Sequence, residues 1–195
     1  MTVLIVGLVL FLGTHWFTTQ RAARAAAIER LGAGRYKGLY SALVAVGLVS
    51  IIIGYGQYRA SGYIPVWHPP QGLSHLALLL MAPVFVLLSI PRRMTWLRAR
   101  TKHPMLLGVK LWALAHLLAN GDLGTILLAG GFLAWAVAAR VSLVRRERDE
   151  GAPDRSGVRF GLPDGIAIGG GLAVYVVFAI WLHPLLIGVS VIATR

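Results

Sequence analysis

Long apolar blocks are the feature of this sequence that most restricts its fold. Hydrophobic residues make up 57% of the 195 residues and charged residues only 13%, whereas soluble domains have about 25% charged residues. The blocks approach the ~20 residues that a helix needs to cross a bilayer. We therefore predict an all-α integral membrane protein, a single domain (1–195) with a bundle of about six transmembrane helices. Their predicted ranges are about 2–19, 39–58, 73–91, 104–120, 123–143 and 163–193.

Basic residues alternate between the predicted loops, which indicates how the chain crosses the membrane. The first loop carries Arg21, Arg24, Arg30, Arg35 and Lys37, the third Arg92, Arg93, Arg98, Arg100 and Lys102, and the fifth Arg140, Arg145, Arg146, Arg148, Arg155 and Arg159. Positively charged loops remain in the cytoplasm, so both termini are expected on the opposite side. The net charge of +12 then reflects topology and contact with lipid headgroups, not binding of nucleic acid.

The residues that are missing exclude several kinds of site. The chain has no cysteine, which rules out disulfides, iron–sulfur clusters and thiolate metal sites. Aspartate and glutamate are absent from the interiors of the predicted spans, which argues against a carboxylate di-metal site or a proton relay. Small residues at four-residue spacing are expected to let helices pack closely in lipid. These are Gly130, Ala134 and Ala138, and Gly161, Gly165 and Gly169.

Histidines are the main candidates for function. Four of them lie in predicted spans: His15, His75, His116 and His183. His103 lies at the entrance of the fourth span, and His68 lies in the second loop. A single histidine in a span most often makes a hydrogen bond between helices. Four in so small a bundle favour a cofactor, because neutral imidazole ligates haem iron, zinc and copper. With no cysteine and no paired carboxylates to complete a metal polyhedron, we expect haem.

Helical geometry limits which histidines could ligate the haem iron together, but it does not select one pair. At ~100° per residue, His103 and Lys110 share a face of the fourth helix, and His116 lies on another face together with Trp112 and Asn120. A haem parallel to the membrane would take His15 and His116 as axial ligands. A haem standing upright near the outer face would take His116 and His75. Both arrangements remain open at this point.

Four sequence blocks resemble the NnrU family of bacterial membrane proteins over nearly the whole chain. They are GLVLFLGTH (7–15), RYKGLYS (35–41), GLSHL (72–76) and the stretch from KHPMLLG (102–108) to WALAHLLANGD (112–122). The resemblance implies a protein of the inner (cytoplasmic) membrane, and with the charge pattern of the loops both termini are then expected to be periplasmic. It also implies a link to denitrification, that is, to nitrite and nitric oxide reduction, with the reductase machinery as possible partners. The family in turn resembles plant ζ-carotene isomerase, a haem b enzyme of redox-dependent cis–trans isomerisation.

Carried over residue by residue, the resemblance implies haem b with His116 and His15 as the axial iron ligands. His75 is then the alternative ligand. Contacts with the two ligands or with the haem propionates would come from His103, Lys110, Trp112 and Asn120. The isomerase has a cysteine three residues before its second ligand where this chain has Ala113, so a thiolate ligand switch is excluded. No catalytic residue is assigned.

Two other functions are compatible with parts of the sequence. The dipeptide His103-Pro104 resembles a motif of membrane methyltransferases, but the cofactor-binding half of those enzymes is missing. A membrane assembly factor or small-molecule transporter without haem is the non-enzymatic alternative. The lack of acidic residues and of two matching broken helices disfavours transport.

Overall fold

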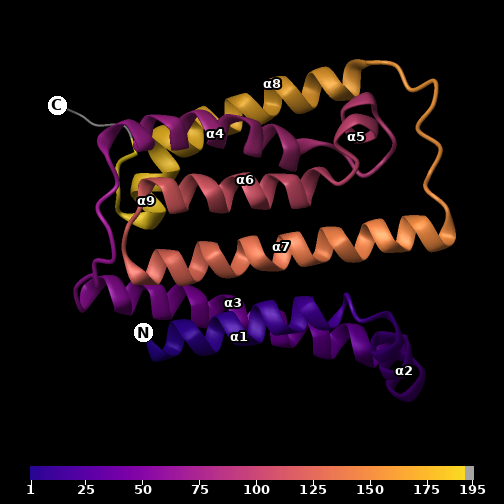
Figure 1. Ribbon diagram of the computed structural model, residues 1–195, viewed down its shortest axis with the longest axis horizontal. Helices are drawn as coiled ribbons and strands as arrows, with labels where there is room; N and C mark the ends of the chain where they lie inside the picture. The colour runs from indigo at the N-terminus through magenta and orange to yellow at the C-terminus, as the bar shows by residue number, and fades with distance from the viewer. Residues whose placement is uncertain (192–195) are drawn as a thin grey trace. The chain divides into compact units, whose positions relative to one another are not determined.

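The computed structural model describes residues 1–191, and these residues are helical over most of their length (Figure 1). In chain order the elements are α1 (Thr2–Phe17), α2 (Arg21–Leu31), α3 (Ala33–Ala60), α4 (Gln71–Ser89), α5 (Trp96–Thr101), α6 (Pro104–Ala119), α7 (Leu123–Glu150), α8 (Leu162–Val177), the π-helical turn η1 (Phe178–Leu182) and α9 (His183–Ile187). Among the described residues, the one extended pairing is an isolated bridge between Pro65 and Asp122. The predicted all-α class is confirmed.

Four helices are long and apolar enough to cross a membrane: α3, α4, α7 and the continuous segment from Leu162 to Ile187. A fifth span is obtained if α1 and α2, which bend by 92°, are counted together, whereas α6 is a shorter apolar helix. Large apolar side chains on these helices point outward, including Val9, Ile52 and Leu79, which are 66%, 63% and 70% exposed. Exposed apolar surface of this extent is typical of helices in contact with lipid.

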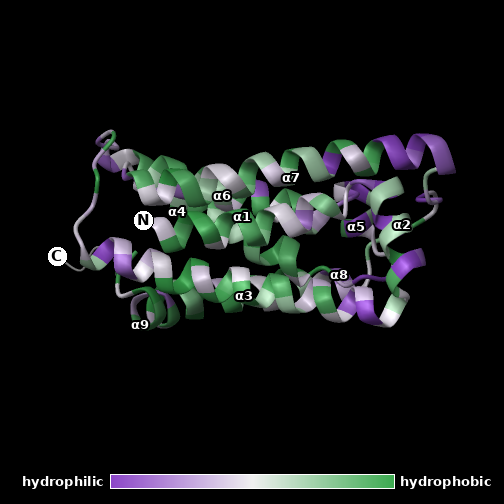
Figure 2. Cartoon of the chain, turned by 90° about the horizontal axis from the view of Figure 1, so that it is seen from below, coloured by the Kyte–Doolittle hydropathy of each residue, from purple (hydrophilic) through white to green (hydrophobic). Residues whose placement is uncertain are grey.

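Several predicted boundaries differ from the structure. The first predicted loop contains the Ala-rich helix α2, because alanine and arginine favour helix even without an apolar face. The fifth predicted helix continues seven residues past 143 to Glu150, and Figure 2 shows α7 becoming hydrophilic toward this end. The last predicted helix reached 193, but residues 192 and 193 lie outside the described residues.

The helices form two compact units, which are described separately. Unit 1 comprises residues 1–68 and 120–143, and unit 2 comprises residues 69–119 together with the described residues from 144 onward. Helix α7 is the element that contributes residues to both units.

In unit 1, α1 and α3 pack antiparallel with their backbones in close approach. A Cβ added to Gly7 would lie 2.6 Å from the backbone nitrogen of Ile51, and one added to Gly47 would lie 2.8 Å from that of Phe11. Gly54 approaches the backbone of Leu4 in the same way. Leu4 and Ile51 are buried at the centre of this contact. Glycine at these positions is therefore required by space.

An extended connection at one end of unit 1 is tied to the start of α7. The backbone N–H of Val66 donates to the carbonyl of Gly121 at 2.8 Å, and that of Leu123 donates to the carbonyl of Ile64 at 2.9 Å. The buried Tyr58 hydroxyl accepts a hydrogen bond from the Ile64 N–H at 3.0 Å. These bonds satisfy backbone groups that an irregular segment would otherwise leave unpaired.

In unit 2, α4 packs against both α6 and α8 (Figure 1). Leu87 and Ile90 at the end of α4 form a small core with Ala167 of α8. Gly171 lies against the backbone of Val86, where an added Cβ would come within 2.7 Å. The α4 and α8 backbones therefore meet at a glycine, as α1 and α3 do in unit 1.

The expectation for the small-residue stripes was wrong in most of its details. A Cβ added to Gly130, Gly165 or Gly169 would meet nothing within 4 Å. The close contact on α7 is made by the next residue, Gly131, against the Leu12 side chain. Adjacent residues point ~100° apart around a helix, and the spacing of small residues alone does not reveal which of them faces the neighbouring helix.

Candidate functional site

His15 lies near the end of α1, surrounded by three aromatic rings. Its Nδ1 is 2.7 Å from the carbonyl oxygen of Phe11, and the two rings stack with centroids 4.3 Å apart. Trp135 of α7 meets the imidazole edge-on at 5.3 Å, and Tyr40 of α3 does so at 5.8 Å. Three helices of unit 1 therefore fix the orientation of a half-buried histidine.

His116 of α6 has the same local arrangement in unit 2. Its Nδ1 is 2.8 Å from the carbonyl oxygen of Trp112, one turn earlier, and the Trp112 ring lies against it with centroids 4.6 Å apart. Ala113 and Ala115 beside it are fully buried. The sequence expectation that Trp112 and His116 share a face of this helix is confirmed by this contact.

These hydrogen bonds fix the tautomer of both rings. A carbonyl oxygen only accepts, so Nδ1 carries the proton in His15 and in His116. The neutral ring then presents its lone pair at Nε2, the atom with which histidine commonly ligates a metal. In metal sites the second ring nitrogen usually donates to a carbonyl or carboxylate in the same manner.

His183 is a third imidazole of this kind, which the sequence reading placed in a span without a role. Its Nδ1 is 2.8 Å from the carbonyl oxygen of Val189, and its ring meets Phe178 edge-on at 6.0 Å. His183 follows the π-helical turn and lies within electrostatic range of His116. Such turns occur often at functional sites, but no residue pattern in the sequence signalled this one.

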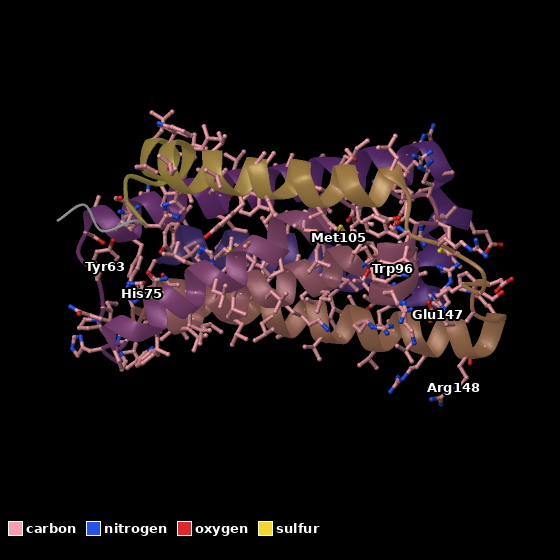
Figure 3. All side chains as sticks on the ribbon, turned by 90° about the horizontal axis from the view of Figure 1, so that it is seen from above. Tyr63, His75, Trp96, Met105, Glu147 and Arg148 are labelled. Atoms are coloured by element: carbon pink, nitrogen blue, oxygen red, sulfur yellow. The ribbon has the colours of Figure 1, made fainter. Side chains whose placement is uncertain are left out.

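The remaining candidate residues of unit 2 occupy different places. His75 is exposed near the start of α4, at the opposite end of this unit from Trp96 and Glu147 (Figure 3). His103 directly precedes α6 and is thirteen residues, or about 20 Å along the helix direction, from His116. Lys110 is half-buried between them.

Asn120, which was expected to contact the haem or its ligands, belongs to unit 1, where it is half-buried directly after α6. Among residues 1–191, no group of three or more His, Cys, Asp or Glu side chains is placed to hold a metal ion.

His103 belongs to an ion-pair cluster with the hydrophilic end of α7. Its Nε2 is 3.1 Å from Oε1 of Glu147, and the same oxygen accepts a 2.6 Å hydrogen bond from Arg155. In the same loop the Ser156 N–H donates to the Asp154 carboxylate at 2.8 Å, which lowers the pKa of that carboxyl. The sequence reading missed Glu147 because it lies beyond the predicted end of its helix.

Asp164 is a buried carboxylate that serves the fold of unit 2. It is 1% exposed and accepts hydrogen bonds from the backbone N–H groups of Leu97 at 2.9 Å and Gly161 at 3.1 Å. A carboxylate surrounded by backbone donors at helix starts is a structural clamp. Asp164 therefore joins the start of α8 to the start of α5.

Comparison with known proteins gives one result. Neither the curated proteins nor the solved structures contain a match to this chain. The family model described as NnrU protein matches residues 3–191. That match runs from the second residue of α1 to beyond the end of α9 and includes every histidine discussed above, so the chain belongs to the NnrU family.

Proposed function

We propose that this NnrU-family protein binds haem b in the membrane, with His116 and His15 as the residues that would hold the iron. The observation that carries the proposal is the arrangement the two residues share. Each donates Nδ1–H to the carbonyl four residues earlier and each is covered by an aromatic ring. This donor set fits haem iron, which takes neutral imidazole through Nε2. His75 is the alternative partner of His116.

The residues of the chain define what such a site could do. Haem iron supplies one-electron redox chemistry when it is bound. The aromatic rings around His15 and His116 hold the orientation of the imidazoles. With two histidines as ligands, binding of a substrate or a small gas molecule would require one imidazole to leave. Ala113 offers no replacement ligand, and the chain contains no cysteine.

The biological role that we propose follows from the family. It is a redox-responsive part of denitrification in the inner membrane, acting with nitrite or nitric oxide reductase, or an isomerase-like activity. Support comes from the family match and from the apolar helices. In a denitrifying host, deletion of the gene should slow nitrite or nitric oxide consumption, and the wild-type gene should restore it, whereas a His15→Ala, His116→Ala double variant should not.

The visible spectrum of the protein purified from haem-supplemented cells tests the cofactor directly. We expect a Soret band and a low-spin ferric state in the wild type. His15→Ala and His116→Ala should each convert the spectrum to high spin or lose the band, and added imidazole should restore part of it. His183→Ala is the matched control and should keep the wild-type spectrum, and His75→Ala, which tests the alternative ligand, should keep it as well.

Two other outcomes of this experiment would change the assignment of the ligands or overturn haem binding. Loss of the low-spin state in His75→Ala but not in His15→Ala would assign the alternative ligand pair. Colourless wild-type protein with normal helical content would overturn the haem proposal and favour an assembly or transport role.

A further inference from the structure

Unit 1 contains three buried hydrogen-bond donors that have no partner. They are the Tyr36 hydroxyl, Nε1 of Trp135 and Nη1 of Arg140. The indole and guanidinium nitrogens can only donate. Buried donors without an acceptor are rare in native proteins, because each loses its bonds to water without replacement. Three in one unit indicate an acceptor that the chain does not provide.

Contacts within unit 1 place these donors at one end of it, around His15. Trp135 meets the His15 ring directly. Tyr36 stacks on Tyr40, with centroids 6.4 Å apart, and Tyr40 in turn meets His15. Arg140 is one and a half turns after Trp135 on α7.

A second contact fixes the register of α7 at this level. The Ser142 hydroxyl, two residues after Arg140, lies 3.3 Å from the carbonyl oxygen of Thr19, just beyond the end of α1. Arg140 is thus held at the level of the last turn of α1, which carries His15.

The missing acceptor should carry negative charge. Unit 1 has two acidic residues, Glu29 and Asp122. Asp122 lies about 27 Å from Arg140 along α7, and Glu29 is exposed. In the part of the chain that the structure describes, Arg140 has no ion pair. Arg24 lies near enough to Tyr40 for its charge to act there, which makes this end more positive.

We propose that Tyr36, Trp135 and Arg140 form a buried binding site for a carboxylate or phosphate group of an amphipathic molecule. Guanidinium donates to both kinds of anion, and bonds to a charged acceptor are about twice as strong as neutral ones. The aromatic rings beside the site suit the apolar body of such a molecule. Two sources have this chemistry: the propionates of haem and the phosphate of an anionic lipid. Assigning the anion to a propionate rests on the proposed function, whereas assigning it to a lipid phosphate does not.

The variants Arg140→Gln, Tyr36→Phe and Trp135→Phe test the site, with Arg35→Gln as the control because Arg35 is exposed beside Tyr36 on α3. Affinity for haem b and for its dimethyl ester is measured by Soret titration. Retention of phosphatidylglycerol against phosphatidylcholine is measured by native mass spectrometry. Circular dichroism confirms that each variant is folded.

If the anion is a propionate, Arg140→Gln should weaken haem b binding by about tenfold or more, and the dimethyl ester should bind wild type and variant equally. If it is a lipid phosphate, Arg140→Gln should lose phosphatidylglycerol and keep its haem affinity. Arg35→Gln should match the wild type in both assays. Equal binding of haem b and phosphatidylglycerol by the wild type and all three site variants would overturn the inference. Absence of a Soret band in the wild type would overturn the haem proposal alone, because the lipid assay still tests the site.

Discussion

The Asp164 carboxylate and the backbone N–H of Leu97 form a 2.9 Å hydrogen bond that joins the first turn of α8 to the first turn of α5. Replacing Asp164 by alanine should leave buried N–H groups of Leu97 and Gly161 without an acceptor. We expect the free energy of unfolding to fall by about 2–3 kcal/mol, measured by denaturant unfolding in detergent micelles.

Asp154→Ala is the control for this prediction. Its exposed carboxylate bonds only within its own loop, so this change should leave the free energy of unfolding near the wild-type value. Equal stabilities of the two variants would show that Asp164 is not a clamp.

Two glycines of α3 offer a matched test of helix packing. Gly54 abuts the backbone of Leu4, whereas a Cβ on Gly56 would meet nothing within 4 Å. Gly54→Ala should push α1 from α3 and destabilise the protein by about 1–3 kcal/mol. Gly56→Ala should be neutral or stabilising, by up to about 1 kcal/mol, because alanine is the better helix former. Thermal unfolding in micelles compares them, and a stable Gly54→Ala protein would contradict the α1–α3 register.

Glu147 should hold the loop between α7 and α8 in place, since its Oε1 contacts both His103 and Arg155. Glu147→Gln removes the negative charge at nearly constant shape. We expect trypsin to cleave after Arg155 or Arg159 several times faster in this variant, because the loop opens more often.

Glu150→Gln is the comparison for the loop. Its pair with Arg146 is about half exposed, and such i,i+4 pairs contribute only about 0.3–0.5 kcal/mol. Cleavage of this variant should match the wild type. An unchanged rate in Glu147→Gln would mean that the loop is ordered by other contacts.

The sequence predicted the helices better than it predicted their contacts, and there is a physical reason. Burial in lipid depends on average hydropathy over about twenty residues, which composition reports directly. Contacts depend on the phase of each helix, and one residue turns a side chain by ~100°. Gly130 and Gly131 show this. The four-residue spacing predicted a packing contact at Gly130, whereas in the structure Gly131 makes the contact, with Leu12.

In the candidate site, too, the sequence predicted the residues better than it predicted their contacts. The span histidines could be recognised because ionisable residues are rare in spans, and the contact of Trp112 with His116 follows from four-residue spacing. The rings of Tyr40 and Trp135 around His15 come from helices far apart in the sequence. Only the tertiary fold brings them together. The π-helical turn before His183 likewise had no pattern of its own.

Tyr58 provides the sharpest test of the extended connection in unit 1. Its side chain is 1% exposed, its ring fills the space beside Gly124, and its hydroxyl accepts the Ile64 N–H at 3.0 Å. Tyr58→Phe keeps the ring and leaves that N–H unpaired, so we expect a loss of about 1–2 kcal/mol. Hydrogen exchange should also become faster at Ile64 and Val66, because their segment is tied to the start of α7 through these bonds. Tyr63→Phe, at a position that is 51% exposed, should leave both measurements near the wild-type values. Exchange at Ile64 and Val66 that stays at the wild-type rate in Tyr58→Phe would show that Tyr58 orders the connection through its ring packing and not through its hydroxyl.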